Sequence, residues 1–320
     1  MFIQKKELER KRSLSSKLVT GIVMGVVTLS VFLLWGDVQK ISGKVFSIGW
    51  TVIGLAILCT LSSYVFRFVK WHYLLNQLKI DLNIKDSFNI WFIGHCMSIT
   101  PGKVGEFIKS YSLKRCFQIE VHVSAPVIFA DLLSDFLAMV MLAALGVVIF
   151  QFGFLFFLAV LIGTIMLLVI LQSRKMVTWI IEKMASFPII RKHKEQLLQF
   201  YDSMYRLIGI KNLLFSFGLS IMAWFLECVS MFIIFKGLSI DLHLLHAIFI
   251  FSFSTLAGAL SMIPGGLGVA EGSLTGMLLY YGIDKSTSVS VTILIRFVTL
   301  WLGFLIGLIV YVRTRKRYQL

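Results

Sequence analysis

The chain has 320 residues, of which 58% are hydrophobic and only 15% are charged, and its mean hydropathy is +0.88. About a quarter of the residues of a soluble protein are charged, so this composition excludes a soluble enzyme and predicts an integral membrane protein. A formal net charge of +15 would favour nucleic acid binding in a soluble protein. In a membrane protein it reflects basic residues gathered on one side of the bilayer, so we expect no nucleic acid partner.

Six apolar runs are long enough to cross a bilayer, which takes roughly 17–25 residues. The first run follows a charged N-terminal stretch, but no small-residue cleavage site follows Trp35, so we expect a retained span and not a secretory signal. The sequence predicts an all-α, polytopic integral membrane protein with a single transmembrane domain over residues 1–320. The six runs are 18–35, 46–66, 125–150, 152–171, 213–235 and 288–312.

Basic residues are distributed unevenly between the segments that separate these runs. Most of the 31 Lys and Arg residues fall on one side if the N-terminus, the loop 172–211 and the C-terminal tail share that side. The opposite side then holds only four, namely Lys40, Lys44, Lys236 and Lys285. By the positive-inside rule we expect a multi-pass protein of the cytoplasmic (inner) membrane with both termini and the basic loop 172–211 in the cytoplasm.

The sequence contains an internal repeat. The pentapeptide LKIDL at 78–82 is similar to LSIDL at 238–242, and SITPGKVG at 98–105 is similar to SMIPGGLG at 261–268. Two matches in the same order indicate a duplication. We therefore expect repeat halves at about 46–150 and 212–312.

Each repeat has a short apolar stretch that a Pro-Gly pair interrupts, at 88–100 and at 247–263. Proline and glycine both interrupt helices, so we expect two re-entrant or broken helix pairs beside about six full spans. The alternative is kinked full spans, ten in all. The first pair faces the cytoplasm and the second the outside, which makes the repeats inverted. Inverted repeats with broken helices are typical of transporters, whose site lies where the breaks meet. Candidate break residues are Pro101, Gly102, Gly105, Pro264, Gly265, Gly266 and Gly268.

Ionisable residues inside apolar segments are costly, so each is a candidate for function. Glu106 and Glu271 follow the two breaks, where the dipole of a new helix could by itself explain a carboxylate. Lys103 and Lys109, near the first break, could attract phosphate or could be ordinary solvated charges. The candidate charged residues are Arg67, Lys103, Glu106, Asp131, Asp135, Glu227, Glu271 and Arg296.

Asp131 and Asp135 lie four residues apart on one helical face and need a cation, a proton or an arginine. Arg296 occupies about the place in the second repeat that Asp131 has in the first, and we predict that it pairs with one or more of these acids. Arg67 and Glu227 are equivalent under the repeat and could pair across it. The charges as a group could be structural ion pairs that hold two halves together, or a wet path for a polar head group.

The sequence provides no pattern for a cofactor, a metal or a covalent nucleophile. The four cysteines form no CxxC pair, the six histidines have no ligand spacing, and no Walker lysine follows the glycines. We therefore expect no cofactor and no metal site.

The motifs PGKVGE at 101–106 and PGGLGVAEG at 264–272, with Arg67, Trp71, Arg296 and Trp301, resemble those of a known family. This is the lysylphosphatidylglycerol synthase transmembrane-region family, also described as flippase-like, AglD-like or UPF0104 membrane proteins. The resemblance covers about 18–312. Family members often have Glu-Arg ahead of an aspartate in the third span, whereas this chain has Asp131, Leu132 and Asp135.

The resemblance implies a flippase-like lipid translocase whose cargo has an anionic or phosphate-bearing head group. In two-domain relatives this region moves aminoacylated phosphatidylglycerol outward and a soluble domain makes that lipid. This chain shows no synthase domain, so we expect no enzyme activity, but a lipid-synthesising enzyme could be its partner. Two alternatives remain. One is a membrane-embedded lipid-phosphate transferase with Mg²⁺ at Asp131 and Asp135. The other is a scaffold for a cell-envelope lipid enzyme that binds through the loop 172–211.

Overall fold

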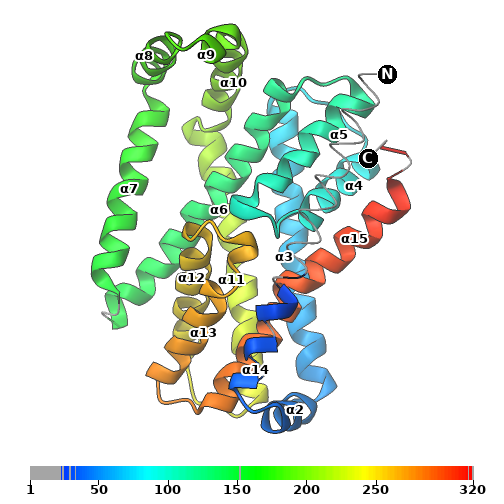
Figure 1. Cartoon of the computed structure of the whole chain (residues 1–320), viewed down its shortest axis with the longest axis vertical. Helices are drawn as coiled ribbons and strands as arrows, with labels where there is room; N and C mark the ends of the chain where they lie inside the picture. The colour runs from blue at the N-terminus through cyan, green and yellow to red at the C-terminus, as the bar shows by residue number, and fades with distance from the viewer. Residues whose placement is uncertain are drawn as a thin grey trace.

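The computed structural model describes residues 23–318, except residues 24, 29, 33, 151, 152 and 316 and the side chains of residues 101–103 and 189. Within this part of the chain the secondary structure is helical, with no strand, which confirms the all-α fold (Figure 1).

In the part of the chain that the structure describes, five helices are long and apolar enough to cross a membrane. At 1.5 Å per residue, a 28-residue helix reaches about 42 Å, more than the roughly 30 Å of a bilayer's hydrocarbon. These five confirm five of the expected spans, and the remaining one, at 18–35, lies partly outside the described residues. They are α3 (Trp50–Gln77), α6 (Val121–Phe150), α7 (Phe154–Gln172), α11 (Ile210–Gly237) and the continuous Lys285–Thr314, made of α14 (Lys285–Arg296), η3 (Phe297–Trp301) and α15 (Leu302–Thr314).

Two helical hairpins are each broken at a Pro-Gly pair. A helix of 13 residues such as α4 reaches only about 20 Å, too short to span. Figure 1 shows α4 and α5 in the upper half of the molecule and α12 and α13 in the lower half, and the turns η1 and η2 contact each other. The first hairpin is α4 (Ile84–Cys96), η1 (Pro101–Phe107) and α5 (Ile108–Phe117), and the second is α12 (Leu244–Leu260), η2 (Pro264–Gly266) and α13 (Val269–Tyr280).

The two halves have matching elements that run in opposite directions (Figure 1). Helices α3 and α11 are both 28 residues long and pack together, and α6 and Lys285–Thr314 are both 30 residues long. The turn after α3 has a positive φ of 58° at Lys79, and the turn after α11 has 55° at Ser239. In both turns the next residue, Ile80 or Ile240, donates its backbone N–H to a carbonyl oxygen in the last turn of the helix. The sequence similarity at these positions therefore corresponds to the same backbone geometry.

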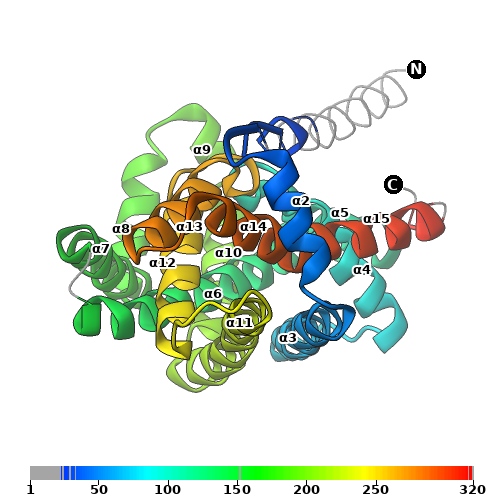
Figure 2. The same ribbon diagram turned by 90° about the horizontal axis from the view of Figure 1, so that it is seen from below.

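The remaining helices lie at the two ends of the bundle (Figures 1 and 2). Helices α8 (Arg174–Met184), α9 (Pro188–Lys192) and α10 (Lys194–Leu207) lie at the end from which the first hairpin enters. Helix α2 (Val38–Ser47) lies at the opposite end against α14.

Gly307 sets the distance between α15 and the first hairpin. A Cβ atom there would lie 2.5 Å from the carbonyl oxygen of Phe92 and 2.7 Å from the backbone nitrogen of Cys96. Because both are backbone atoms of α4, neither can rotate away. We expect Gly307→Ala to lower the free energy of unfolding by about 1–3 kcal/mol. Thermal unfolding in detergent measures this change. The control is Gly163→Ala on α7, where an added Cβ would have nothing within 4 Å. Equal melting temperatures of the two variants would contradict this packing.

Asp284 caps α14 and ties it to α2. Its Oδ1 accepts from the backbone N–H of Thr287 at 3.1 Å, and the Lys44 ammonium lies 3.0 Å from Oδ2. Burial raises the pKa of Asp284, but the hydrogen bonds from Thr287 and Lys44 outweigh it and lower the pKa from 3.8 to about 2. The stabilisation is therefore complete above pH 3.8 and is lost as the pH falls through about 2.

Asp284→Ala removes this cap and should cost about 1 kcal/mol. Because the pKa of Asp284 lies far below neutrality, the difference in melting temperature from the wild type should be the same at pH 5 and at pH 8. A difference that vanishes at pH 5 would mean that another group supplies the effect.

Candidate functional site

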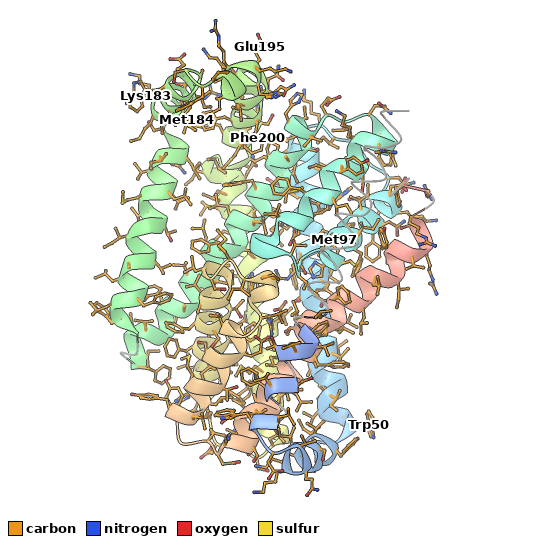
Figure 3. All side chains as sticks on the ribbon, in the orientation of Figure 1. Trp50, Met97, Lys183, Met184, Glu195 and Phe200 are labelled. Carbon is orange, nitrogen blue, oxygen red and sulfur yellow. The ribbon has the colours of Figure 1, made fainter. Side chains whose placement is uncertain are left out.

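A cavity of about 370 Å³ lies between the two broken hairpins. Both breaks contribute to its wall, through Thr100 from the first and through Gly265 and Gly266 from the second. Figure 3 labels Met97, the residue that follows α4, near mid-height of the molecule. The five lining residues that carry charge are Arg67, Glu106, Asp135, Glu227 and Arg296.

Arg67 joins three long helices at this cavity. Its Nη1 donates to Asp135 Oδ2 of α6 at 2.9 Å, and its Nη2 donates to Glu227 Oε1 of α11 at 2.8 Å. The guanidinium also stacks over the Trp224 ring at 4.1 Å, and only 7% of Arg67 is exposed. The predicted pairing of Arg67 with Glu227 across the repeat is confirmed.

Lys70 is the partner of the two aspartates on α6, and the sequence analysis missed it. Its ammonium lies 2.9 Å from Asp131 Oδ1 and 2.5 Å from Asp135 Oδ1, and it donates to Ser220 Oγ at 2.8 Å. The residue is fully buried. Lys70 lies three residues after Arg67 and so on the same helical face, a signal that could have placed it here.

The prediction that Arg296 pairs with Asp131 or Asp135 is wrong. Arg296 instead donates from Nε to Glu271 Oε1 at 2.6 Å. Glu271 belongs to the hairpin directly preceding α14, so the acid within reach is the local one. Lys70 already occupies the two aspartates.

Arg296 also holds the second break in place. Its Nη2 donates to the carbonyl oxygen of Gly265 at 2.8 Å, while Glu271 Oε2 accepts from the backbone N–H of Gly268 at 2.6 Å. Glu271 is therefore both a helix cap and an ion-pair partner. Gly265 has a φ of 61°, and a Cβ on Gly266 would lie 3.0 Å from the Cα of Gly258 on α12, so both positions favour glycine.

The first break has its own ion pair, between Lys109 and Glu106. The ammonium of Lys109 lies 2.8 Å from Glu106 Oε2 and 3.7 Å from Asp131 Oδ2, and it is 4.7 Å from the centre of the Trp71 ring. Lys109 is therefore buried and paired, and it is neither a solvated charge nor open to phosphate as it stands. The side chains of Pro101, Gly102 and Lys103 lie outside the described residues.

Gly105 closes the first break tightly. Its backbone N–H donates to Thr100 Oγ1 at 2.6 Å, and a Cβ would lie 2.6 Å from the carbonyl oxygen of Met97. Of the candidate residues described, five do not line the cavity, namely Gly105, Asp131, Pro264, Gly268 and Glu271.

Among the described side chains, four carboxylates and three cations form one buried network of ion pairs, and Glu271 and Arg296 form a separate buried pair. Each cation contacts at least one acid, as charges taken out of water require. The described residues hold no group of three or more His, Cys, Asp or Glu that could bind a metal. The members of the network are Glu106, Asp131, Asp135, Glu227, Arg67, Lys70 and Lys109.

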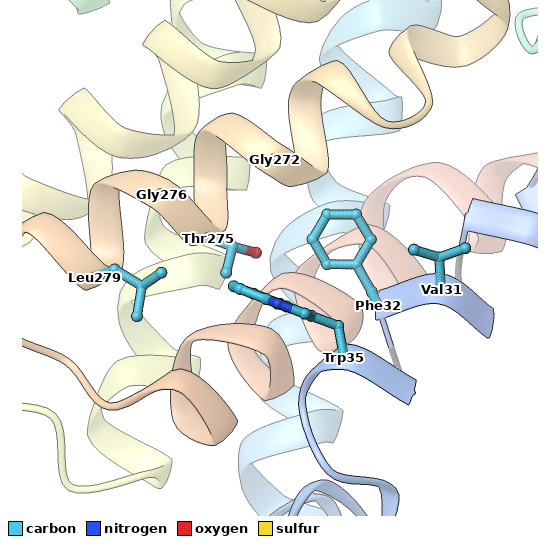
Figure 4. A pocket seen from close by; sticks show the side chains of 7 residues that line it. All are labelled: Val31, Phe32, Trp35, Gly272, Thr275, Gly276 and Leu279. Carbon is cyan, nitrogen blue, oxygen red and sulfur yellow. The ribbon is translucent and has the colours of Figure 1, made fainter.

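A second pocket, of about 240 Å³, lies between α13 and the segment that precedes α2 (Figure 4). Phe32 and Trp35 face Gly272, Thr275 and Gly276 across it. None of its lining residues is charged, and it shares none of them with the central cavity.

This arrangement defines a polytopic α-helical membrane protein with an inverted repeat around a charged cavity. The family model of the lysylphosphatidylglycerol synthase TM region matches residues 21–307, and the chain belongs to this family. The two Pro-Gly motifs predicted this membership from the sequence.

The chain is also similar to archaeal proteins described as UPF0104 membrane proteins. One from Methanothermobacter thermautotrophicus is 22% identical over 88% of this chain and 90% of its own length. One from Pyrococcus horikoshii is 26% identical over 92% of this chain and 96% of its own length. The similarity thus extends over nearly the whole of each protein.

Proposed function

We propose that this protein translocates a lipid across the cytoplasmic membrane, with the head group passing through the central cavity while the acyl chains stay in the bilayer. The observation that carries the proposal is the cavity of about 370 Å³ between two oppositely directed broken hairpins, lined by charged residues of both repeats. Inverted repeats with broken helices surround the substrate site in many transporters.

Buried charges support a polar cargo. Charged side chains in a membrane are rare and costly, and they usually line a pathway for polar substrates. Arg67 and Arg296 line the cavity and could donate to a phosphate when they exchange one of their present acceptors. Glu106 and Glu227 line the same space and could accept from an ammonium. A phosphate-bearing head group, neutralised in part by an amine, is the cargo that this lining favours.

The alternative of a metal-dependent lipid-phosphate transferase has less support. Asp131 and Asp135 would have to bind Mg²⁺, but both contact the buried ammonium of Lys70. Binding a divalent cation there would require Lys70 to leave or to lose its proton. A lipid-synthesising enzyme remains a partner that we propose for supplying the cargo.

A translocation assay on the purified protein tests the proposal. Proteoliposomes receive fluorescent phospholipids of different head groups, or native lipid extract, and a membrane-impermeant quencher reports the fraction of probe in the outer leaflet. We expect quenching to exceed that of protein-free vesicles for at least one phosphate-bearing lipid. No protein-dependent translocation of any lipid offered would overturn the proposal, and specific Mg²⁺ binding by the wild type, lost in Asp131→Asn, would favour the transferase.

A further inference from the structure

Helix α8 begins at the end of a span that faces lipid. Most side chains of α7 are apolar and exposed or half-buried, and only Phe157 and Thr164 are buried. Ser173 alone separates α7 from α8, and Figure 1 shows α8 lying across the end of α7. The start of α8 is therefore placed at the boundary between the hydrocarbon and the head groups.

One side of α8 carries exposed apolar side chains, with Lys183 between them. Met176, Trp179 and Met184 are 45%, 58% and 46% exposed, and the helical repeat places them on a common side. Phe187, just before α9, extends the apolar surface with 64% exposure. The adjoining side of α8 packs on α10, where Arg174 pairs with Asp202 at 3.3 Å. Figure 3 shows Lys183 and Met184 at the outer end of the molecule, away from the bundle.

Basic residues surround this apolar surface. Lys175, Lys183, Arg191 and Lys192 are all exposed. The ammonium of Lys183 lies 4.9 Å from the centre of the Trp179 ring, so the charge and the aromatic anchor face the same way. An amphipathic helix with an apolar face and basic flanks lies in the plane of a membrane interface, where anionic lipids strengthen its binding.

We propose that α8 and α9 form a binding surface for the anionic lipid head groups of the adjacent leaflet. The apolar side chains Met176, Trp179, Met184 and Phe187 insert at the acyl boundary, and Lys175, Lys183, Arg191 and Lys192 contact the head groups. This inference does not rest on the proposed translocation.

The depth of α8 is tested with the full chain in liposomes of phosphatidylcholine that contain a minor fraction of phosphatidylglycerol. In a variant without its four native cysteines, an environment-sensitive fluorophore is attached at Met176→Cys or at Thr178→Cys. Two residues turn a helix by about 200°, so Thr178 is a matched control on the opposite face. We expect blue-shifted emission and strong quenching by spin-labelled lipid for Met176→Cys only, and quenching by aqueous iodide for Thr178→Cys.

The preference for anionic lipid is tested with the same probe and with spin labels on phosphatidylglycerol or phosphatidylcholine. At equal mole fractions, the phosphatidylglycerol quencher should be more effective by about twofold or more, because each basic residue near the surface attracts anionic lipid. Replacing Lys175, Lys183, Arg191 and Lys192 together by glutamine should equalise the two quenchers.

Three results would overturn the inference. Equal quenching of the wild-type surface by both lipids would remove the anionic preference. Iodide access at position 176 equal to that at 178 would place the face in water. A shielded probe that no lipid quencher reaches would mean that a protein, such as a second copy of this chain, covers the surface.

Discussion

Arg67→Met is expected to lower the free energy of unfolding by about 3–5 kcal/mol, because it leaves the buried carboxylate of Glu227 without a cation and leaves Asp135 with Lys70 alone. Arg67 is bonded to Asp135 at 2.9 Å and to Glu227 at 2.8 Å, and the acidic side chains are less than a tenth exposed. Methionine has a similar length, so the effect reports charge and not an empty space. Thermal unfolding of the purified protein in detergent measures the change.

The effect of Arg67→Met is separable from a general loss of positive charge. Lys236→Met removes a charge from an exposed position at the end of α11 and should leave the melting temperature nearly unchanged. Adding Glu227→Gln to Arg67→Met should recover part of the lost stability, since the side chain that lost its cation is then neutral. If Arg67→Met had the melting temperature of the wild type, Arg67 would not stabilise the contact between α3, α6 and α11.

Arg296→Lys is expected to loosen the second break while keeping the charge. The guanidinium of Arg296 bonds to Glu271 through Nε and to the Gly265 carbonyl through Nη2, and one shorter ammonium cannot reproduce both bonds. Losing a hydrogen bond to a charged group costs about 1.5–3 kcal/mol. Local opening of residues 264–268 should then become roughly tenfold more frequent or greater.

Hydrogen exchange measured by mass spectrometry on peptides that cover residues 261–272 reports this opening. Peptides of the first hairpin, residues 98–108, provide the internal control and should exchange as in the wild type. Faster exchange in both hairpins would indicate general destabilisation, and unchanged exchange in the second would show that Arg296 does not hold the break. Under the proposed function, lipid translocation by Arg296→Lys should fall as well.

Much of this architecture could be predicted from the sequence because membranes impose simple rules. Long apolar runs have to be helical in a bilayer, and the Pro-Gly pairs mark the helix breaks. The repeat was visible in the LKIDL and LSIDL segments, which form equivalent turns with positive φ at Lys79 and Ser239. The equivalence of Arg67 and Glu227 also predicted their contact correctly.

The partners of the other charges depended on packing that the sequence does not encode locally. The equivalent positions of Arg296 and Asp131 in the two repeats predicted that Arg296 pairs with the aspartates of α6. Equivalence in a repeat does not show which side chains come into contact. Lys70 reaches both aspartates because α3 and α6 contact each other. The sequence left Lys109 either as a residue that attracts phosphate or as a solvated charge, yet the first hairpin folds back and buries it against Glu106.

A chemical block inside the cavity tests the central claim most directly. Thr255 lines the cavity, whereas Ser186 lies exposed between α8 and α9. In a background without Cys59, Cys96, Cys116 and Cys228, Thr255→Cys and Ser186→Cys are each modified with a bulky thiol reagent and assayed for lipid translocation in proteoliposomes. We expect modification at position 255 to abolish translocation and modification at 186 to leave it unchanged. Full translocation after complete modification at position 255, verified by mass spectrometry, would show that the head group does not pass through this cavity.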